Sequence, residues 1–296
     1  MSNVLIIGAG SIGVFLGTKL YSSGQNVFLY GRRKLEEIED VVLIDGKTYK
    51  SPPKIKLKKG MQFDYIFVTT KLYDTLKAVN EIIKNKIKYK MLCIIQNGLV
   101  DDNFYQNIGK NYARLAIFQG YNLNDNKIIT SKSKMGWMIE NNKNAKEIYD
   151  LIKKSGIEIT KSDEVDKFRA EKMLINCSVN ALSAIYNVPV GKILIDLQLR
   201  EKCENLFDET YEVLNKEFDI GDKEDLRKRF YEVINSVAHH YSSTHQDLFS
   251  KRKTEIEFLN GYIIRLGKRL NISTPENEKI YNTLLRVSSQ THFSGL

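Results

Sequence analysis

The first half of the chain alternates short apolar runs with segments whose apolar residues recur at helical spacing. The runs predict buried strands at 4–7, 27–30, 65–68, 91–95, 115–117, 136–139 and 157–160. The segments between them predict helices at 12–23, 72–84 and 145–155. Residues 41–44 and 47–49, joined across Asp45-Gly46, predict a small hairpin. Strands that alternate with helices predict a largely parallel sheet covered on both faces.

The pattern changes near Asp163. From about Glu164 onward strand signals nearly vanish, and long helical patterns follow at 165–185, 196–217, 223–241 and 254–270. We therefore expect two domains. An α/β domain should cover residues 1–163, and an all-α domain should cover residues 164–296.

A glycine pattern lies between the first predicted strand and the first predicted helix. Gly8-Ala9-Gly10-Ser11-Ile12-Gly13 has the form G-x-G-x-x-G, in which the first glycine permits a tight turn and the second lets the backbone approach a pyrophosphate. The third permits close packing of helix on strand, and the helix N-terminus offers N–H groups to the phosphates. A tight turn without a ligand is the alternative, but the position of the motif favours a Rossmann-type dinucleotide-binding domain. We expect all six residues to bind the cofactor.

The end of the second predicted strand indicates which dinucleotide is bound. An NAD site usually has an Asp or Glu there, whereas this strand runs into Gly31-Arg32-Arg33-Lys34 and meets no acid before Glu36. A guanidinium suits the 2′-phosphate of NADP because it can form paired hydrogen bonds with it. A basic loop without a ligand is the alternative. We expect Arg32 to bind the cofactor, and the cofactor to be NADPH/NADP+.

Charge and composition narrow the class of ligand only in part. Lys and Arg number 45 against 36 Asp and Glu, and this net charge of +9 favours anionic ligands. The lysine-rich stretches 54–59 and 84–90 carry no interleaved aromatic motif, so we interpret them as solvated surface and expect no nucleic acid. No stretch approaches the roughly 18 apolar residues of a membrane span, and no basic region precedes the first apolar run. We expect neither a membrane partner nor a signal peptide.

Cysteine and histidine usage bears on location and metals. The chain has 3 cysteines, far apart and without a C-x-x-C pair, which favours a reduced, cytoplasmic setting. His239, His240 and His245 lie near one another in sequence, but no Cys or carboxylate completes a ligand set, so we expect no metal.

A polar stripe runs along the predicted helix at 165–185. Lys172, Asn176 and Asn180 recur at i, i+4 and i+8, so they drift only about 80° around the helix and span roughly 12 Å. Asparagine is a poor helix former, so two of them in a mostly apolar helix need a reason. They either cap or cross-link neighbouring helices, or they face a ligand. The lysine beside them favours a ligand.

At this helix the sequence resembles a known family. Residues 169–182, RAEKMLINCSVNAL, closely resemble the central helix of ketopantoate reductases, the 2-dehydropantoate 2-reductases. The resemblance extends over nearly the whole chain, and the further matching segments follow in the family's order: 8–13, Arg32, Thr70-Lys71, Gln96-Asn97-Gly98, 242–247, 253–257, Asn260-Gly261 and 273–277. It implies a two-domain NADPH-dependent reductase with its site in the cleft between the domains.

The resemblance also implies roles for single residues. Lys172 matches the general acid that delivers a proton to the ketone, and Glu255 matches the carboxylate that orients this lysine or binds substrate. We also expect Glu255 to contact the cofactor. The remaining matches are to residues that hold the substrate or lie beside its pocket (Asn97, Asn176, Asn180, Ser243 and Asp247) and to residues near the nicotinamide and the phosphates (Asn97 and Lys71). The chain departs from the family at Ala170, where an aromatic residue is common, and at Ala181, where proline is common.

The implied reaction is reduction of 2-dehydropantoate to (R)-pantoate, a step of pantothenate and coenzyme A biosynthesis. A reductase of the same family that acts on another branched 2-oxo acid is the first alternative. A nucleotide-sensing protein without activity is the second, although the set of Lys172, Asn176, Asn180, Ser243 and Glu255 speaks against it. The expected partners are a small 2-oxo acid and a second copy of the chain in a homodimer.

Overall fold

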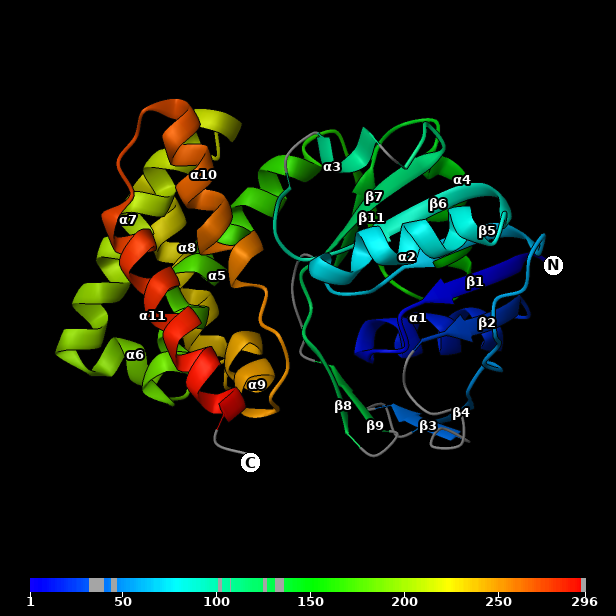
Figure 1. Ribbon diagram of the computed structural model, residues 1–296, viewed down its shortest axis with the longest axis horizontal. Helices are drawn as coiled ribbons and strands as arrows, with labels where there is room; N and C mark the ends of the chain where they lie inside the picture. Colours follow the sequence, from blue (N-terminus) through cyan, green and yellow to red (C-terminus); the bar gives the residue numbers. More distant parts are fainter. Residues whose placement is uncertain are drawn as a thin grey trace. The chain divides into compact units, whose positions relative to one another are not determined.

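The computed structural model describes residues 1–31, 40–43, 47–100, 103–106, 108–124, 127–130 and 136–293. The chain divides into two compact units, Met1–Asn97 with Asp102–Val165 and Gly98–Asp101 with Asp166–Leu296 (Figure 1). The first unit contains a mostly parallel sheet with helices, and the second is helical in its described residues. The expected fold class, an α/β Rossmann-type domain followed by an all-α domain, is confirmed.

The α/β unit is built on a seven-stranded sheet in the order β11-β10-β7-β6-β5-β1-β2. Its strands are β1 Asn3–Ile7, β2 Asn26–Tyr30, β5 Gln62–Val68, β6 Lys88–Ile95, β7 Tyr112–Ile117, β10 Trp137–Glu140 and β11 Ile159–Ser162. Val4 pairs with Val27 of β2 and with Tyr65 of β5, both in parallel register. Only β10 runs antiparallel to its neighbour β7. The predicted strands are therefore present, in a largely parallel sheet.

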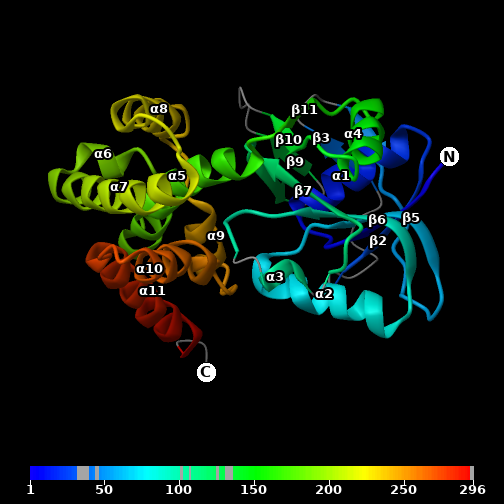
Figure 2. The same ribbon diagram turned by 90° about the horizontal axis from the view of Figure 1, so that it is seen from above.

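Helices cover both faces of this sheet. Figure 2 shows α1 (Ser11–Ser22) and α4 (Ala145–Lys154) on one face and α2 (Leu72–Lys84) on the other. Because successive side chains of a strand point to opposite faces, Val4 and Ile6 pack in the core cluster that includes Leu16 and Leu20 of α1. The whole of Val4-Leu5-Ile6-Ile7 is buried, which explains its continuous apolar run. The short helix α3 is Asn103–Gln106.

A second, four-stranded sheet has the order β4-β3-β9-β8. Its strands are β3 Asp40–Leu43, β4 Thr48–Lys50, β8 Tyr121–Asn124 and β9 Lys127–Thr130. The antiparallel pairing of β3 with β4 confirms the predicted hairpin, although its turn at 44–46 lies outside the described residues. The sequence did not predict β8 and β9. The pairing of β9 with β3 joins segments more than eighty residues apart, and β8 pairs with β9.

The second unit consists of helices around one apolar core. They are α5 Val165–Tyr186, α6 Lys192–Ile195, α7 Leu197–Phe218, α8 Lys223–Ser236, α9 Ser243–Phe249, the 3₁₀ turn η2 Ile256–Phe258, α10 Asn260–Leu270 and α11 Pro275–Phe293. Within the described part of the chain, no helix is long and apolar enough to cross a membrane.

Two helix predictions in this unit were wrong at one end. The helix predicted at 223–241 ends at Ser236, because the carbonyls of Ala238 and His240 accept hydrogen bonds from Gly191 and Val190 (both 2.9 Å). These two carbonyls therefore bond to residues outside the helix instead of to amides one turn further along it. The helix predicted at 254–270 begins only at Asn260, after η2. Helices α6, α9 and α11 were not predicted from the sequence.

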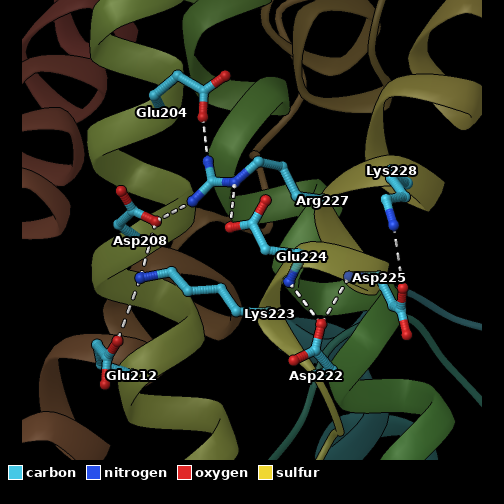
Figure 3. A network of polar contacts seen from close by, with 9 residues as sticks. All are labelled: Glu204, Asp208, Glu212, Asp222, Lys223, Glu224, Asp225, Arg227 and Lys228. Atoms are coloured by element: carbon cyan, nitrogen blue, oxygen red, sulfur yellow. Dashed lines mark hydrogen bonds and ion pairs between the residues drawn. The ribbon is translucent and has the colours of Figure 1, made fainter.

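An ion-pair network joins α7 to α8 (Figure 3). The Arg227 guanidinium donates to Glu204 and, at 2.6 Å, to Asp208, while Lys223 Nζ lies 3.0 Å from the same Asp208 and 3.2 Å from Glu212. Burial alone would raise the pKa of Asp208, but the hydrogen bonds from Lys223 and Arg227 outweigh it and lower that pKa. The network links α7 and α8 through charged side chains.

Candidate active site

The glycine turn connects β1 to α1 and closes tightly on itself. Gly8 has φ +116°, a conformation that favours glycine, and its N–H donates to the Tyr30 carbonyl at 2.8 Å. A Cβ at Gly13 would lie 1.8 Å from the Gly8 carbonyl oxygen, so only glycine fits there. A Cβ at Gly10, by contrast, would meet no atom within 4 Å. The turn is therefore closely packed between Gly8 and Gly13 and has open space at Gly10.

The open side of the turn has the character of an anion site. Helix α1 begins at Ser11 with Gly10 as its N-cap, so no side chain caps its first N–H groups, and no acidic residue lies in its first turn. Uncapped N–H groups and the positive end of the helix dipole attract phosphate. The open space at Gly10 lets a phosphate approach the backbone. Residues 8–13 thus fit the pyrophosphate of a dinucleotide.

The end of β5 is fastened to this turn. The Thr69 amide donates to the Ile7 carbonyl at 2.8 Å, and the Thr69 hydroxyl donates to the Gly8 carbonyl at 2.8 Å. Thr70 and Lys71 follow, and Lys71 is the N-cap residue of α2. Asn97 follows β6, whose carboxyl end lies beside that of β5 because the two strands are parallel neighbours. The structure therefore brings the glycine turn, Lys71 and Asn97 to one edge of the sheet.

The residue expected to choose between NADP and NAD is Arg32. It lies outside the described residues, together with Arg33 and Lys34. Only the beginning of this segment is described: Gly31 follows β2, and a Cβ there would lie 2.8 Å from the Ala9 backbone nitrogen. The chain thus leaves β2 directly against the glycine turn, on the side where a dinucleotide's adenosine ribose lies.

The polar stripe lies on α5 in the helical unit. Lys172, Asn176 and Asn180 are half-buried, whereas Met173 and Cys177 beside them are buried in the core. Among the described residues, none forms a hydrogen bond with the side chain of Asn176 or of Asn180. A cross-link between helices would require such a bond. The two amides are therefore available to a ligand.

Helix α9 is anchored directly to this stripe. The Ser242 hydroxyl donates to the Asn180 carbonyl at 2.9 Å and accepts from the His245 amide at 3.1 Å, so it caps α9 and ties it to α5. Ser243, the first residue of α9, is exposed. Ser243 was predicted as a site residue and Ser242 was not, although a serine before a helix is a common N-cap signal.

The two carboxylates expected at the site are both buried. Asp247 on α9 is 4% exposed, and its Oδ1 accepts from Arg252 Nε at 3.0 Å. Glu255 is 7% exposed and immediately precedes η2. Buried carboxylates are rare unless they are paired, because removing their charge from water costs free energy. Both positions therefore require partners that stabilise the charge. The structure places Lys172, Asn176, Asn180, Ser243, Asp247 and Glu255 in the helical unit, and Gly8–Gly13, Lys71 and Asn97 in the α/β unit.

Two of the segments that resemble the family, Asn260-Gly261 and 273–277, each contribute an asparagine to a buried hydrogen-bond network. Asn260 is 1% exposed and donates through Nδ2 to the Cys177 carbonyl at 3.0 Å and to Asn277 Oδ1 at 2.9 Å. Asn277 donates in turn to Glu209 Oε1 at 2.8 Å. This network joins α10 and α11 to α5 and α7. Cys177 itself is buried, and burial raises the pKa of its thiol, which disfavours the nucleophilic thiolate form.

The comparisons with known proteins agree with this architecture. The family model for ketopantoate reductase PanE/ApbA matches residues 4–132, and the model for the C terminal of ketopantoate reductase PanE/ApbA matches residues 164–288. The chain is 24% identical to the 2-dehydropantoate 2-reductase of Vibrio cholerae serotype O1 over 291 residues, which are 95% of this chain and 96% of that protein.

Solved structures share the fold over nearly the whole length. The ternary structure of D-mandelate dehydrogenase with NADH and anilino(oxo)acetate has a TM-score of 0.85 at 21% identity and covers 98% of this chain and 99% of that one. A dimeric ketopantoate reductase from Staphylococcus aureus has a TM-score of 0.83 at 18% identity, covering 97% of this chain and 99% of its own.

Proposed function

The chain belongs to the ketopantoate reductase PanE/ApbA family of oxidoreductases, and from this premise we propose that it reduces 2-dehydropantoate to (R)-pantoate with NADPH. The observation that carries the proposal is the pair of half-buried amides on α5, Asn176 and Asn180, which have no hydrogen-bond partner among the described residues. The lysine on the same stripe supplies a proton donor. Both features suit a small 2-oxo acid.

The cofactor is held, in this proposal, at the carboxyl edge of the main sheet. The backbone of Gly8–Gly13 and the N-terminus of α1 bind its pyrophosphate, Arg32 binds the 2′-phosphate, and Lys71 and Asn97 line the edge beyond. When bound, the nicotinamide supplies the hydride. Arg32 makes NADPH the preferred form, because no acid that could accept from a ribose hydroxyl replaces it before Glu36.

Lys172 is proposed to act as the general acid. Addition of hydride to a ketone builds negative charge on the oxygen, and a positioned ammonium both stabilises that charge and delivers the proton. Glu255 orients the lysine or contacts a bound ligand. Its burial at 7% exposure makes it effective in either role, because its charge is little screened by water.

Substrate binding falls to the remaining polar residues of the helical unit. Asn176 and Asn180 donate to the carboxylate and the hydroxyl of the substrate, and the exposed Ser243 joins them from α9, which Ser242 holds against Asn180. Asp247 lies on the same helix and is paired with Arg252. Its role is to fix α9 beside the pocket.

A second candidate substrate is another branched 2-oxo acid. The position where the family commonly has an aromatic residue is Ala170, which is fully buried in the helical core. A smaller side chain there changes the packing behind the stripe rather than a polar contact on it. The similar fold of D-mandelate dehydrogenase, solved with NADH, shows which other substrate and cofactor to include in an assay.

The assembly and location are also proposed. We infer a homodimer, in line with the dimeric relative from Staphylococcus aureus. A cytoplasmic location accords with three cysteines that are all buried as free thiols.

The deciding experiment is a substrate panel. The purified protein is mixed with NADPH or NADH and, in turn, 2-dehydropantoate, other branched 2-oxo acids and benzoylformate, and the absorbance of the reduced nicotinamide is followed. We expect the highest kcat/KM for 2-dehydropantoate with NADPH. A higher value for another 2-oxo acid would replace the substrate, and absence of turnover with all of them would refute the proposed function.

A further inference from the structure

A buried hydroxyl lies between the two loops that follow β5 and β6. Thr75, in the first turn of α2, is fully buried. Its Oγ1 lies 3.2 Å from the Lys71 carbonyl oxygen, to which it donates, and 3.2 Å from the Thr70 hydroxyl, and it accepts from Gln96 Nε2. A hydroxyl has one donor and two acceptor positions. Since its hydrogen goes to Lys71, Thr70 and Gln96 both donate to it, and its capacity is fully used.

This arrangement fixes the orientation of the Gln96 amide. With Nε2 held by Thr75, the carbonyl oxygen Oε1 must point away from that hydroxyl. Gln96 is only 8% exposed, and no described residue donates a hydrogen bond to its Oε1. A buried acceptor without a partner is costly and rare, and such groups mark places where a ligand or an ordered water completes the site.

The sheet order shows which part of a dinucleotide would reach Gln96. Gln96 directly follows β6, and β5 and β6 lie on the opposite side of β1 from β2. A dinucleotide with its pyrophosphate at the β1 turn and its adenosine ribose at the end of β2 extends its other half across the ends of β5 and β6. That half carries the nicotinamide, whose carboxamide has an N–H donor.

We propose that Gln96 is a further cofactor-binding residue, whose Oε1 accepts a hydrogen bond from the nicotinamide carboxamide, and that Thr75 is the positioning residue that holds its amide in this orientation. The inference rests on the proposed nicotinamide cofactor and is independent of which 2-oxo acid is reduced. It also explains why Thr75 joins the Lys71 and Gln96 loops: the two loops are set before the cofactor arrives.

Direct binding tests the contact without any turnover. Calorimetric titrations compare NADP+ with its 3-acetylpyridine analogue, in which a methyl ketone replaces the carboxamide and removes the N–H, and NAD+ with the corresponding analogue in parallel. The wild type should bind the natural dinucleotide about tenfold more tightly, because the analogue leaves Oε1 unpaired. Gln96→Met, which lacks the acceptor, should bind the natural form about tenfold more weakly and should not distinguish the two. A Gln96→Met protein that still distinguishes them, or a wild type that does not, overturns the inference.

A matched set of threonine variants tests the positioning role. Thr75→Val keeps the shape of the side chain and removes the hydroxyl, and it should weaken NADP+ binding several-fold and reduce the preference over the analogue, whereas Thr75→Ser should restore both. Thr18→Val is the control, because Thr18 on α1 is equally buried and its Oγ1 has no partner among the described residues. Its affinity should equal that of the wild type.

The outcomes separate this inference from the proposed function. If Thr75→Val unfolds at a lower temperature but keeps affinity and preference, Thr75 is only structural and the positioning role is refuted. If the wild type binds and distinguishes the dinucleotides but reduces no 2-oxo acid, the inference stands and the proposed function fails. If it binds neither dinucleotide, both are refuted.

Discussion

Two glycine-to-alanine substitutions three residues apart in the glycine turn should have opposite effects. Gly10 has φ −82° and open space around its missing Cβ, so Gly10→Ala is compatible with the fold. Gly13 has the Gly8 carbonyl oxygen 1.8 Å and the Thr69 hydroxyl 2.5 Å from that position. The same methyl group is therefore harmless to the fold at one position and excluded at the other.

The magnitudes follow from these distances. Ordinary contacts between heavy atoms are about 3.5 Å, so Gly13→Ala must displace backbone by more than about 1.5 Å. Overpacking costs about 1–3 kcal/mol, and a clash with backbone belongs at or above the upper end, which corresponds to a fall in Tm of roughly 6–12 °C. For Gly10→Ala, the weaker N-cap is offset by the reduced freedom of the unfolded chain, so stability should stay within about 0.5 kcal/mol. Its methyl group should cost about 1.5–3 kcal/mol of phosphate contacts, or roughly 10–150-fold in cofactor affinity.

The assay combines thermal unfolding with calorimetric titration of NADPH for both variants and the wild type. Gly13→Ala should show a lowered Tm without cofactor. Gly10→Ala should show an unchanged Tm without cofactor, and NADPH should raise that Tm less than it raises the Tm of the wild type. A Gly10→Ala protein with wild-type affinity would refute the placement of the phosphates at this turn. A Gly13→Ala protein with wild-type Tm would refute the packing argument.

Five further substitutions test other parts of the protein. Lys172→Ala should lower kcat by about 10²–10⁴-fold while Tm and NADPH affinity are kept, and in combination with Glu255→Ala the loss should be less than the sum if the two act as a unit, which steady-state kinetics of both single variants and the double variant decide. Asn180→Ala should raise KM for the 2-oxo acid by an amount that corresponds to about 1–3 kcal/mol of lost binding free energy, and Tm should stay equal or rise. A fall in Tm would show instead that Asn180 cross-links helices. Arg32→Asp should weaken NADPH by about 1.5–3 kcal/mol and change NADH little, and equal kcat/KM for the two cofactors in the wild type would contradict the assigned preference. His245 is buried between the rings of Tyr241 and Phe249, and burial lowers its pKa, so below the unfolded value of about 6.5 the unfolded chain binds more protons. The free energy of unfolding should therefore fall as pH drops below about 6.5, and denaturant titrations of His245→Gln should show a flatter dependence.

The α/β unit could be predicted well because its signals are local. Strands buried on both faces read as unbroken apolar runs, as in Val4-Leu5-Ile6-Ile7, and the predicted helix at 72–84 has the bounds of α2. The antiparallel direction of β10 could not be predicted, because an apolar run carries no sign of strand direction. The pairing of β3 with β9 joins distant segments and has no local signal either.

The helical unit shows where local pattern fails. Residues 237–241 continue the helical periodicity, yet their carbonyls bond to residues 190 and 191, a competition that only the folded chain reveals. The short helix α9 depends on the Ser242 cap and its bond to Asn180. Similarly, nothing in the sequence around Thr75 or Gln96 indicates that a hydroxyl and an amide more than twenty residues apart use each other's hydrogen-bonding capacity.

The four asparagines of the helical unit discussed above differ in their hydrogen-bond partners, and this difference indicates function better than the residue type does. Asn260 and Asn277 are almost fully buried. Asn260 donates to Asn277, and Asn277 donates to Glu209, so both amide groups have donor partners within the fold. Asn176 and Asn180 lie in the interior of α5, where each costs about 0.6 kcal/mol of helix propensity relative to alanine, and no described residue repays that cost with a hydrogen bond. A cost that the free protein does not recover is typical of a functional site, where stability is given up for binding. We expect the α5 amides to acquire hydrogen-bond partners when a ligand binds, and that expectation distinguishes them from Asn260 and Asn277, which the sequence alone could not tell apart from them.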